Sequence, residues 1–237
     1  MKSNYNDIID IILTFISDEE IRENMLISGS IVPYLISGKP SNEYHSDIYF
    51  FIKENKISSV RKKLKKLSRD YLFDIVCDSK NYINEDYGFK IKYEDTYIGI
   101  FPYEYGQNTF TIKTYRINKE EKNIYLKTKN ICDVTRNMII RQISFLKDKS
   151  IKLVSPEYIY IDKKMRERKP HNPTKETMEL LNKICDESIL KVLEESMSKM
   201  DINIKELKIK EKNKKLIYIL VISLILLVII TYICFKK

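Results

Sequence analysis

Two short stretches decide the fold of this chain: residues 28–35 read SGSIVPYL, and residues 45–52 read HSDIYFFI. The second stretch is rich in apolar and aromatic residues, which predicts a strand. Because strand side chains alternate between two faces, Asp47 and Tyr49 are expected to project from one face while Ile48 enters the core. Asp47 is an acid in an otherwise apolar strand, so it needs a metal ion or a basic partner.

Composition and charge bound the class of protein. The 237 residues are 43% hydrophobic, which is enough for a folded core. The formal net charge is +9, but six lysines against two glutamates in 205–215 contribute +4, and Lys236 and Lys237 add +2. The remaining +3, spread over residues 1–204, is too little to indicate a nucleic-acid surface.

The extra positive charge flanks an apolar run. The 20 residues from 216 to 235 include no charge, Pro or Gly. As a helix they would span about 30 Å, the thickness of the hydrocarbon core of a bilayer. The run therefore predicts a single-pass C-terminal membrane anchor, a transmembrane helix from Leu216 to Phe235. A buried core helix is the alternative, but it would not normally be apolar on every face. The basic cluster before the run predicts that the soluble domain is cytoplasmic.

Cysteine and histidine are sparse. Four cysteines and two histidines, all widely spaced, do not form a zinc pattern. In a cytoplasmic domain the cysteines are expected to be reduced thiols. His45 is expected to hydrogen-bond within its loop rather than to act in catalysis.

Hydrophobic periodicity in the first half predicts an α+β fold with a mixed β-sheet and flanking helices. Helices are predicted over 7–16 and 56–69, with a short helix between Gly29 and Gly38. Strands after the first one are predicted over 71–77, 88–93, 96–102, 109–115 and 123–127.

The second half is predicted to be helical. Apolar residues recur at helical spacing over 132–146, and Ser155 and Asn172 are candidate N-caps, each before a Pro. The last helix is expected to reach Met200. We therefore divide the chain into an α/β core (1–130), a helical C-terminal region (131–200), a basic juxtamembrane connector expected to form a helical stalk (201–215), and the transmembrane helix (216–235).

Three features resemble the nucleotidyltransferase superfamily, and in particular minimal bacterial nucleotidyltransferase domains related to abortive-infection and toxin–antitoxin systems. They are the Ile-Ser-Gly-Ser start at 27–30, the His-Ser-Asp-Ile sequence at 45–48, and the strand IGIFPYE at 98–104. The resemblance covers residues 26–170. It implies a nucleotidyltransferase-like fold that holds a nucleoside triphosphate together with Mg²⁺.

The resemblance also implies roles for individual residues. Gly29 and Ser30 would bind the triphosphate through backbone amides and a hydroxyl. Asp47 would bind the metal and act as the catalytic carboxylate. Apart from the resemblance, the segment 154–168 is predicted to place Tyr158, Lys164 and Arg168 along a helix that could face a nucleotide, which makes Lys164 and Arg168 candidate nucleotide-binding residues. Ordinary charge spacing on a surface helix explains them more simply.

Two positions depart from the pattern of the family. Tyr49 stands where the second acid of the strand is expected, and a neutral phenol is a poor ligand for Mg²⁺. A third carboxylate is expected on a neighbouring strand. If that strand is 96–102, Gly99 falls in its place, and the candidates that remain outside it are Asp74, Asp95 and Glu104.

Two functions from different classes follow. The first is a tail-anchored nucleotidyltransferase-like pseudoenzyme, which binds a nucleotide or a protein partner with weak or lost catalysis. The second is an active metal-dependent enzyme that transfers a nucleoside monophosphate from an NTP to a protein, an RNA or a small molecule. Because two-metal chemistry needs several anionic ligands, the sequence favours the first.

Overall fold

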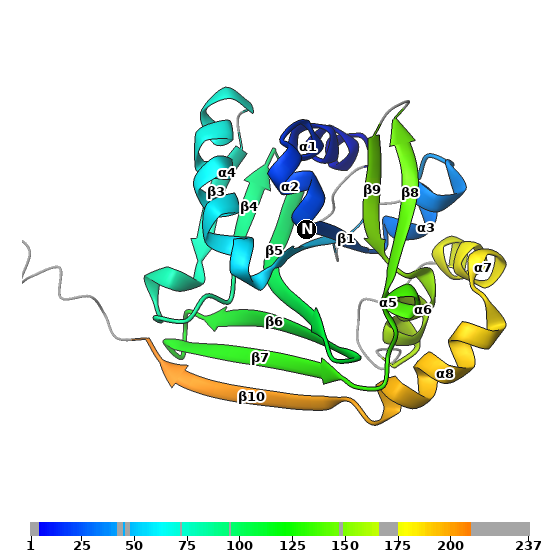
Figure 1. Cartoon of the computed structure of the whole chain (residues 1–237). Helices are drawn as coiled ribbons and strands as arrows, with labels where there is room; N and C mark the ends of the chain where they lie inside the picture. Colours follow the sequence, from blue (N-terminus) through cyan, green and yellow to red (C-terminus); the bar gives the residue numbers. More distant parts are fainter. Residues whose placement is uncertain are drawn as a thin grey trace, which may run out of the picture.

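A ten-stranded mixed sheet with helices packed around it organises the chain (Figure 1). The computed structural model describes residues 5–41, 45, 48–71, 73–94, 96–146, 149–165 and 175–209. The predicted α+β class with a mixed sheet is confirmed. The residues outside the description include four of the predictions above: Asp47, Asp95, Arg168 and the transmembrane segment 216–235. Within the described part, no helix is long and apolar enough to cross a bilayer.

The centre of the sheet is built from β1 (Met25–Gly29), β2 (Ile48–Lys53) and β5 (Thr96–Gly106). Strand β2 pairs antiparallel with β1 on one side and parallel with β5 on the other. The full order is β10-β7-β6-β5-β2-β1-β9-β8, and β4 (Phe89–Tyr93) joins β5 to β3 (Phe73–Asp78) off this path. Strand β1 was not predicted, because its five residues are too few to show an alternating pattern.

Three long strands form one edge of the sheet. In Figure 1, β6 (Thr109–Asn118), β7 (Asn123–Ile131) and β10 (Asp201–Lys208) run side by side across the bottom of the molecule. The pairing of β7 with β10 is antiparallel and covers all eight residues of β10. Seven of these eight residues are exposed, so hydrogen bonding rather than burial holds this strand in place.

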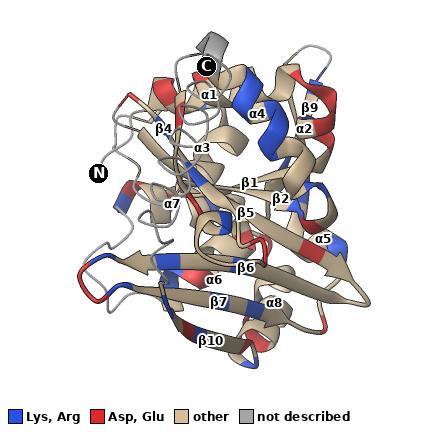
Figure 2. Ribbon diagram, turned by 90° about the vertical axis from the view of Figure 1, so that its left-hand side faces the viewer, with Lys and Arg blue, Asp and Glu red and all other residues tan. Residues whose placement is uncertain are grey.

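Helices α1 (Tyr5–Ser17), α2 (Glu19–Asn24) and α4 (Ile57–Tyr71) pack near β1, β2 and β3, and two of them carry an apolar stripe toward the core. In α1 the stripe places Phe15 edge-on to Phe50 of β2, with ring centroids 5.4 Å apart. The short turn η1 (Glu54–Lys56) leads into α4, which confirms the helix predicted at 56–69. Figure 2 shows that basic residues cover much of α4.

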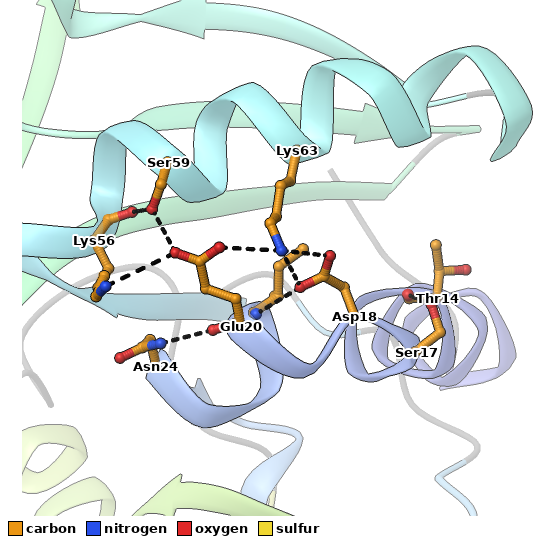
Figure 3. Close-up of polar contacts among 9 residues, drawn as sticks. Thr14, Ser17, Asp18, Glu20, Asn24, Lys56, Ser59 and Lys63 are labelled. Carbon is orange, nitrogen blue, oxygen red and sulfur yellow. Dashed lines mark hydrogen bonds and ion pairs between the residues drawn. The ribbon is translucent and has the colours of Figure 1, made fainter.

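A polar network connects α2 to α4 (Figure 3). Asp18 caps α2 by accepting a hydrogen bond from the backbone N–H of Ile21 at 3.1 Å. The Lys63 ammonium lies 2.8 Å from Asp18 and 3.0 Å from Glu20, and Ser59 donates to Glu20 at 2.9 Å. Part of the basic face of α4 is therefore occupied with intramolecular ion pairs.

The remaining helices lie mostly in the second half. They are α3 (Val32–Ser37), α5 (Arg136–Ile139), α6 (Pro156–Met165), α7 (Lys175–Ile184) and α8 (Glu187–Ser198), and a short turn η2 (Ser79–Asn81) follows β3. Ser155 caps α6 as predicted, because its hydroxyl accepts from the N–H of Tyr158 at 3.2 Å. Asn172, the other candidate cap, lies outside the described residues.

The structure corrects three predictions in this half. The helix predicted over 132–146 is only the four-residue α5, after which β8 (Ile140–Leu146) pairs with β9 (Lys149–Val154). The single helix expected to reach Met200 is broken between α7 and α8, where Asp186 caps α8 by accepting from Ser188 and Ile189. The expected helical stalk begins instead with β10, because residues 201–208 find a partner in β7.

Candidate functional site

The candidate site begins at the turn from β1 into α3. Gly29 ends β1 with a φ of +102°, a backbone conformation that glycine adopts without the steric cost of a side chain. Val32 then starts α3 with Pro33 in its first turn, which suits the fixed φ of proline. Every residue from Met25 to Leu35 is buried. The Gly29–Ser30 pair therefore opens a short helix, as predicted, but it follows a strand that was not predicted, and the fold encloses it.

The Ser30 hydroxyl has an intramolecular partner. Its Oγ lies 2.9 Å from Nδ1 of His45, and the two residues are only 8% and 2% exposed. The His45 ring packs edge-on against Tyr34, with centroids 5.3 Å apart. His45 was expected to hydrogen-bond within its own loop; the described bond joins it to Ser30 across the turn, and most of the loop itself lies outside the described residues. No pattern in the sequence indicates this pairing, because the two residues meet only when the strands pair.

The start of β2 lies beside this turn. The antiparallel register pairs Ile48, the first residue of β2, with Gly29. Ile48 is buried, as the alternation of strand faces predicted. Asp47, the candidate metal ligand and catalytic carboxylate, lies outside the described residues.

Aromatic rings occupy the face of the sheet on which the resemblance implies further carboxylates. Tyr49 is half-buried and pairs in register with Gly99 of β5, so β5 is the neighbouring strand considered above. The Phe101 ring covers Gly99 so closely that a Cβ there would lie 2.4 Å from its Cε2 atom. Tyr49 also packs against Phe101 and Phe51, with centroids 5.8 and 6.3 Å away.

The apolar character of this face continues on β6. Tyr115 packs edge-on against Phe101 at 5.9 Å, and burial, together with the nearby Cys77 thiol, raises the pKa of its phenol. A phenol with a raised pKa stays neutral near pH 7 and cannot act as an anionic ligand. Tyr49, Phe51, Phe101 and Tyr115 therefore form an aromatic cluster, and this name is used for them below.

The described residues do not supply the set of carboxylates that the Mg²⁺ implied by the resemblance would need. Among the described residues, no group of three or more His, Cys, Asp and Glu side chains is placed to hold a metal ion. Asp74 is exposed on β3 opposite Lys92, and Glu104 is exposed on β5 beyond the last residue that pairs with β2. Neither joins the aromatic cluster, and Asp95 is outside the description.

The candidate nucleotide-binding residues of α6 lie apart from this turn. Lys164 is exposed, and its ammonium lies 4.5 Å from the centroid of the Tyr160 ring on the same helix. Tyr158 is a core residue that packs edge-on against Phe110 of β6. Arg168 lies outside the described residues. No described contact brings Lys164 together with Gly29 or Ser30.

Comparison of the chain with protein-family models and with curated proteins returned no match. Function is therefore argued from the residues and their geometry.

Proposed function

We propose that this protein is a membrane-attached, nucleotidyltransferase-like nucleotide-binding module in which metal-dependent nucleotidyl transfer is lost. The single observation that carries this proposal is the aromatic cluster at Gly99. The resemblance implies an acid at that position for two-metal chemistry, and the Phe101 ring fills the space instead. A carboxylate would have to displace this ring before it reached a metal beside Tyr49.

The turn at Gly29 supports the nucleotide-binding part of the proposal. Its positive φ and its position between a strand and a helix are typical of backbone that approaches a phosphate closely. Burial limits this site, because the fold encloses every residue from Met25 to Leu35 and the Ser30 hydroxyl already has a hydrogen-bond partner in His45. Binding of a triphosphate is therefore expected to be weak and to involve local rearrangement of this turn.

Pyrophosphate release tests the loss of transfer. The full-length chain, purified in detergent, is incubated with each of the four NTPs and Mg²⁺ or Mn²⁺. We expect no release above that of an Asp47→Asn variant, with Asp74→Asn as the matched control on an exposed strand. Release that Asp47→Asn abolishes and Asp74→Asn preserves would show an active enzyme and overturn the proposal.

Thermal unfolding of the same samples tests binding. A ligand that binds only the folded state raises the melting temperature, and the effect grows with ligand concentration. We expect at least one NTP to raise it, with no added effect of divalent metal. If no NTP changes the melting temperature at millimolar concentration, the nucleotide-binding part of the proposal is wrong.

A further inference from the structure

A pocket of about 560 Å³ opens where β2 leaves the side of β5. The pairing of the two strands ends at Lys53 and Tyr103, because the chain then turns into η1, while β5 continues through Glu104 to Gly106. On this side β5 has no strand partner beyond Tyr103 in the described register. Arg136 of α5 also lines the pocket.

The charged groups of the pocket favour an anion. Lys53, Arg136 and Glu104 are exposed, and no ion pair joins any of them to another described residue. Glu54, the other acid in the lining, lies 2.5 Å from Lys113 and is neutralised by it. Two unpaired cations therefore face one unpaired carboxylate, and a ligand with a net negative charge balances them.

Two tyrosine side chains line the pocket and contribute polar atoms to it. The hydroxyl of Tyr105 donates to the Val134 carbonyl at 3.1 Å, which holds its ring in place. Tyr103 is buried, and burial raises the pKa of its phenol to about 12 despite the opposing effect of Arg136. Tyr103 thus stays protonated near pH 7 and can donate a hydrogen bond.

We propose that this pocket binds a small organic anion, in which a carboxylate or phosphate contacts Lys53 and Arg136 and a hydrogen-bond donor contacts Glu104. The volume favours an organic ligand over an inorganic ion, because pockets of several hundred Å³ hold whole small molecules. The site is separate from the Gly29 turn, since Lys53 lies at the opposite end of β2 from Ile48. It is therefore independent of the nucleotide-binding function proposed above.

Isothermal titration calorimetry of the full-length chain in detergent tests the pocket. The probes are L-glutamate and the four nucleoside monophosphates, which carry a carboxylate or a phosphate, and inorganic phosphate alone. We expect at least one organic probe to bind more tightly than inorganic phosphate. Arg136→Gln and Lys53→Gln should each weaken its binding about tenfold or more, because each removes a charge-assisted hydrogen bond.

Matched variants separate this site from others. Arg116→Gln, an exposed arginine on β6, and Ser30→Ala, at the Gly29 turn, should leave binding of that probe unchanged. Melting curves from circular dichroism establish that each variant is folded. The proposal is overturned if no organic probe binds, if inorganic phosphate binds as tightly, or if folded Arg136→Gln and Lys53→Gln bind as well as the unaltered chain. It is also overturned if Ser30→Ala removes the binding.

Discussion

The Tyr49 side chain illustrates how one residue can decide between catalysis and packing. The resemblance implies an acid at this position, and the sequence has a phenol there. In the structure the phenol ring is part of a packed face, stacked on Phe51 at an interplanar angle of 19° and tilted against Phe101. The neighbouring residues therefore fill the space around Tyr49 with other aromatic rings.

Replacement of Tyr49 by Asp tests that conclusion. Tyr49→Asp should lower the free energy of unfolding by about 2–4 kcal/mol, because it removes a large ring and places a carboxylate against Phe101. Tyr49→Phe, which keeps the ring, should cost about 1 kcal/mol or less. Urea denaturation followed by circular dichroism measures both. A stable Tyr49→Asp variant that gains Mn²⁺-dependent thermal stability would contradict this conclusion. It would indicate that the unaltered chain has a metal site that lacks only one ligand.

Arg61 shows how one element is tied to its neighbours. The side chain of this α4 residue is buried, makes two hydrogen bonds to Asp86 at 2.5 and 2.6 Å, and lies 3.1 Å from Asp78 at the end of β3. Its guanidinium also sits 4.8 Å from the centroid of the Phe89 ring on β4. Arg61 therefore joins α4 to β3 and β4, whereas Lys62, Lys65 and Lys66 of the same helix are exposed.

The Arg61–Asp86 pair predicts a pH dependence. Burial alone would raise the pKa of Asp86, but the hydrogen bonds from Arg61 outweigh it and hold the pKa below its usual value. A lowered folded-state pKa means that ionised Asp86 stabilises the fold above about pH 4, and that this contribution is lost as the pH falls below it. Asp86→Asn should therefore cost about 1–3 kcal/mol at pH 7, and the difference should shrink toward pH 3.

Urea denaturation at pH 7, 5 and 3 measures this difference. The exposed Asp74→Asn variant serves as control and should match the unaltered chain at all three values. A constant difference between the unaltered chain and Asp86→Asn across the range would show that the carboxylate charge does not contribute.

For the whole molecule, local patterns predicted the first half of the fold well and the second half poorly. The stripe Ile57, Val60, Leu64 correctly indicated α4, because helical contacts are close in sequence. The segment 140–146 shows apolar spacing compatible with a helix, but β9 offers it a pairing edge that no local pattern reveals. Likewise, β10 pairs with residues of β7 that are distant in sequence.

The candidate site was also predicted only in part from the sequence. The short helix after Gly29 was predicted from the sequence, but the strand before it and the positive φ of Gly29 were not. The hydrogen-bond partner of this junction was not predicted either, since His45 meets Ser30 only in the folded chain. Lys53 and Arg136 were missed for the same reason, because the fold rather than a motif brings them to one pocket.

Residues 216–235 are the predicted membrane anchor, and β10 lies only a few residues before them, so a test of the anchor must keep β10 intact. The described chain ends at Ile209, whose N–H donates to the Lys122 carbonyl at 2.7 Å, so the sheet extends almost to the predicted span. Only six residues, 210–215, separate it from Leu216. Even fully extended, this connection reaches about 25 Å, so the anchor would hold the β10 edge near the bilayer.

Truncation after Ile209 should therefore release a folded domain, while the full-length chain should stay in the membrane pellet after carbonate extraction. Truncation after Met200, which the sequence alone would suggest, removes β10 and exposes the edge of β7 along its whole pairing. We expect the shorter product to unfold at a lower temperature and to aggregate, which light scattering detects. Recovery of the full-length chain in the carbonate supernatant would show that residues 216–235 do not anchor it.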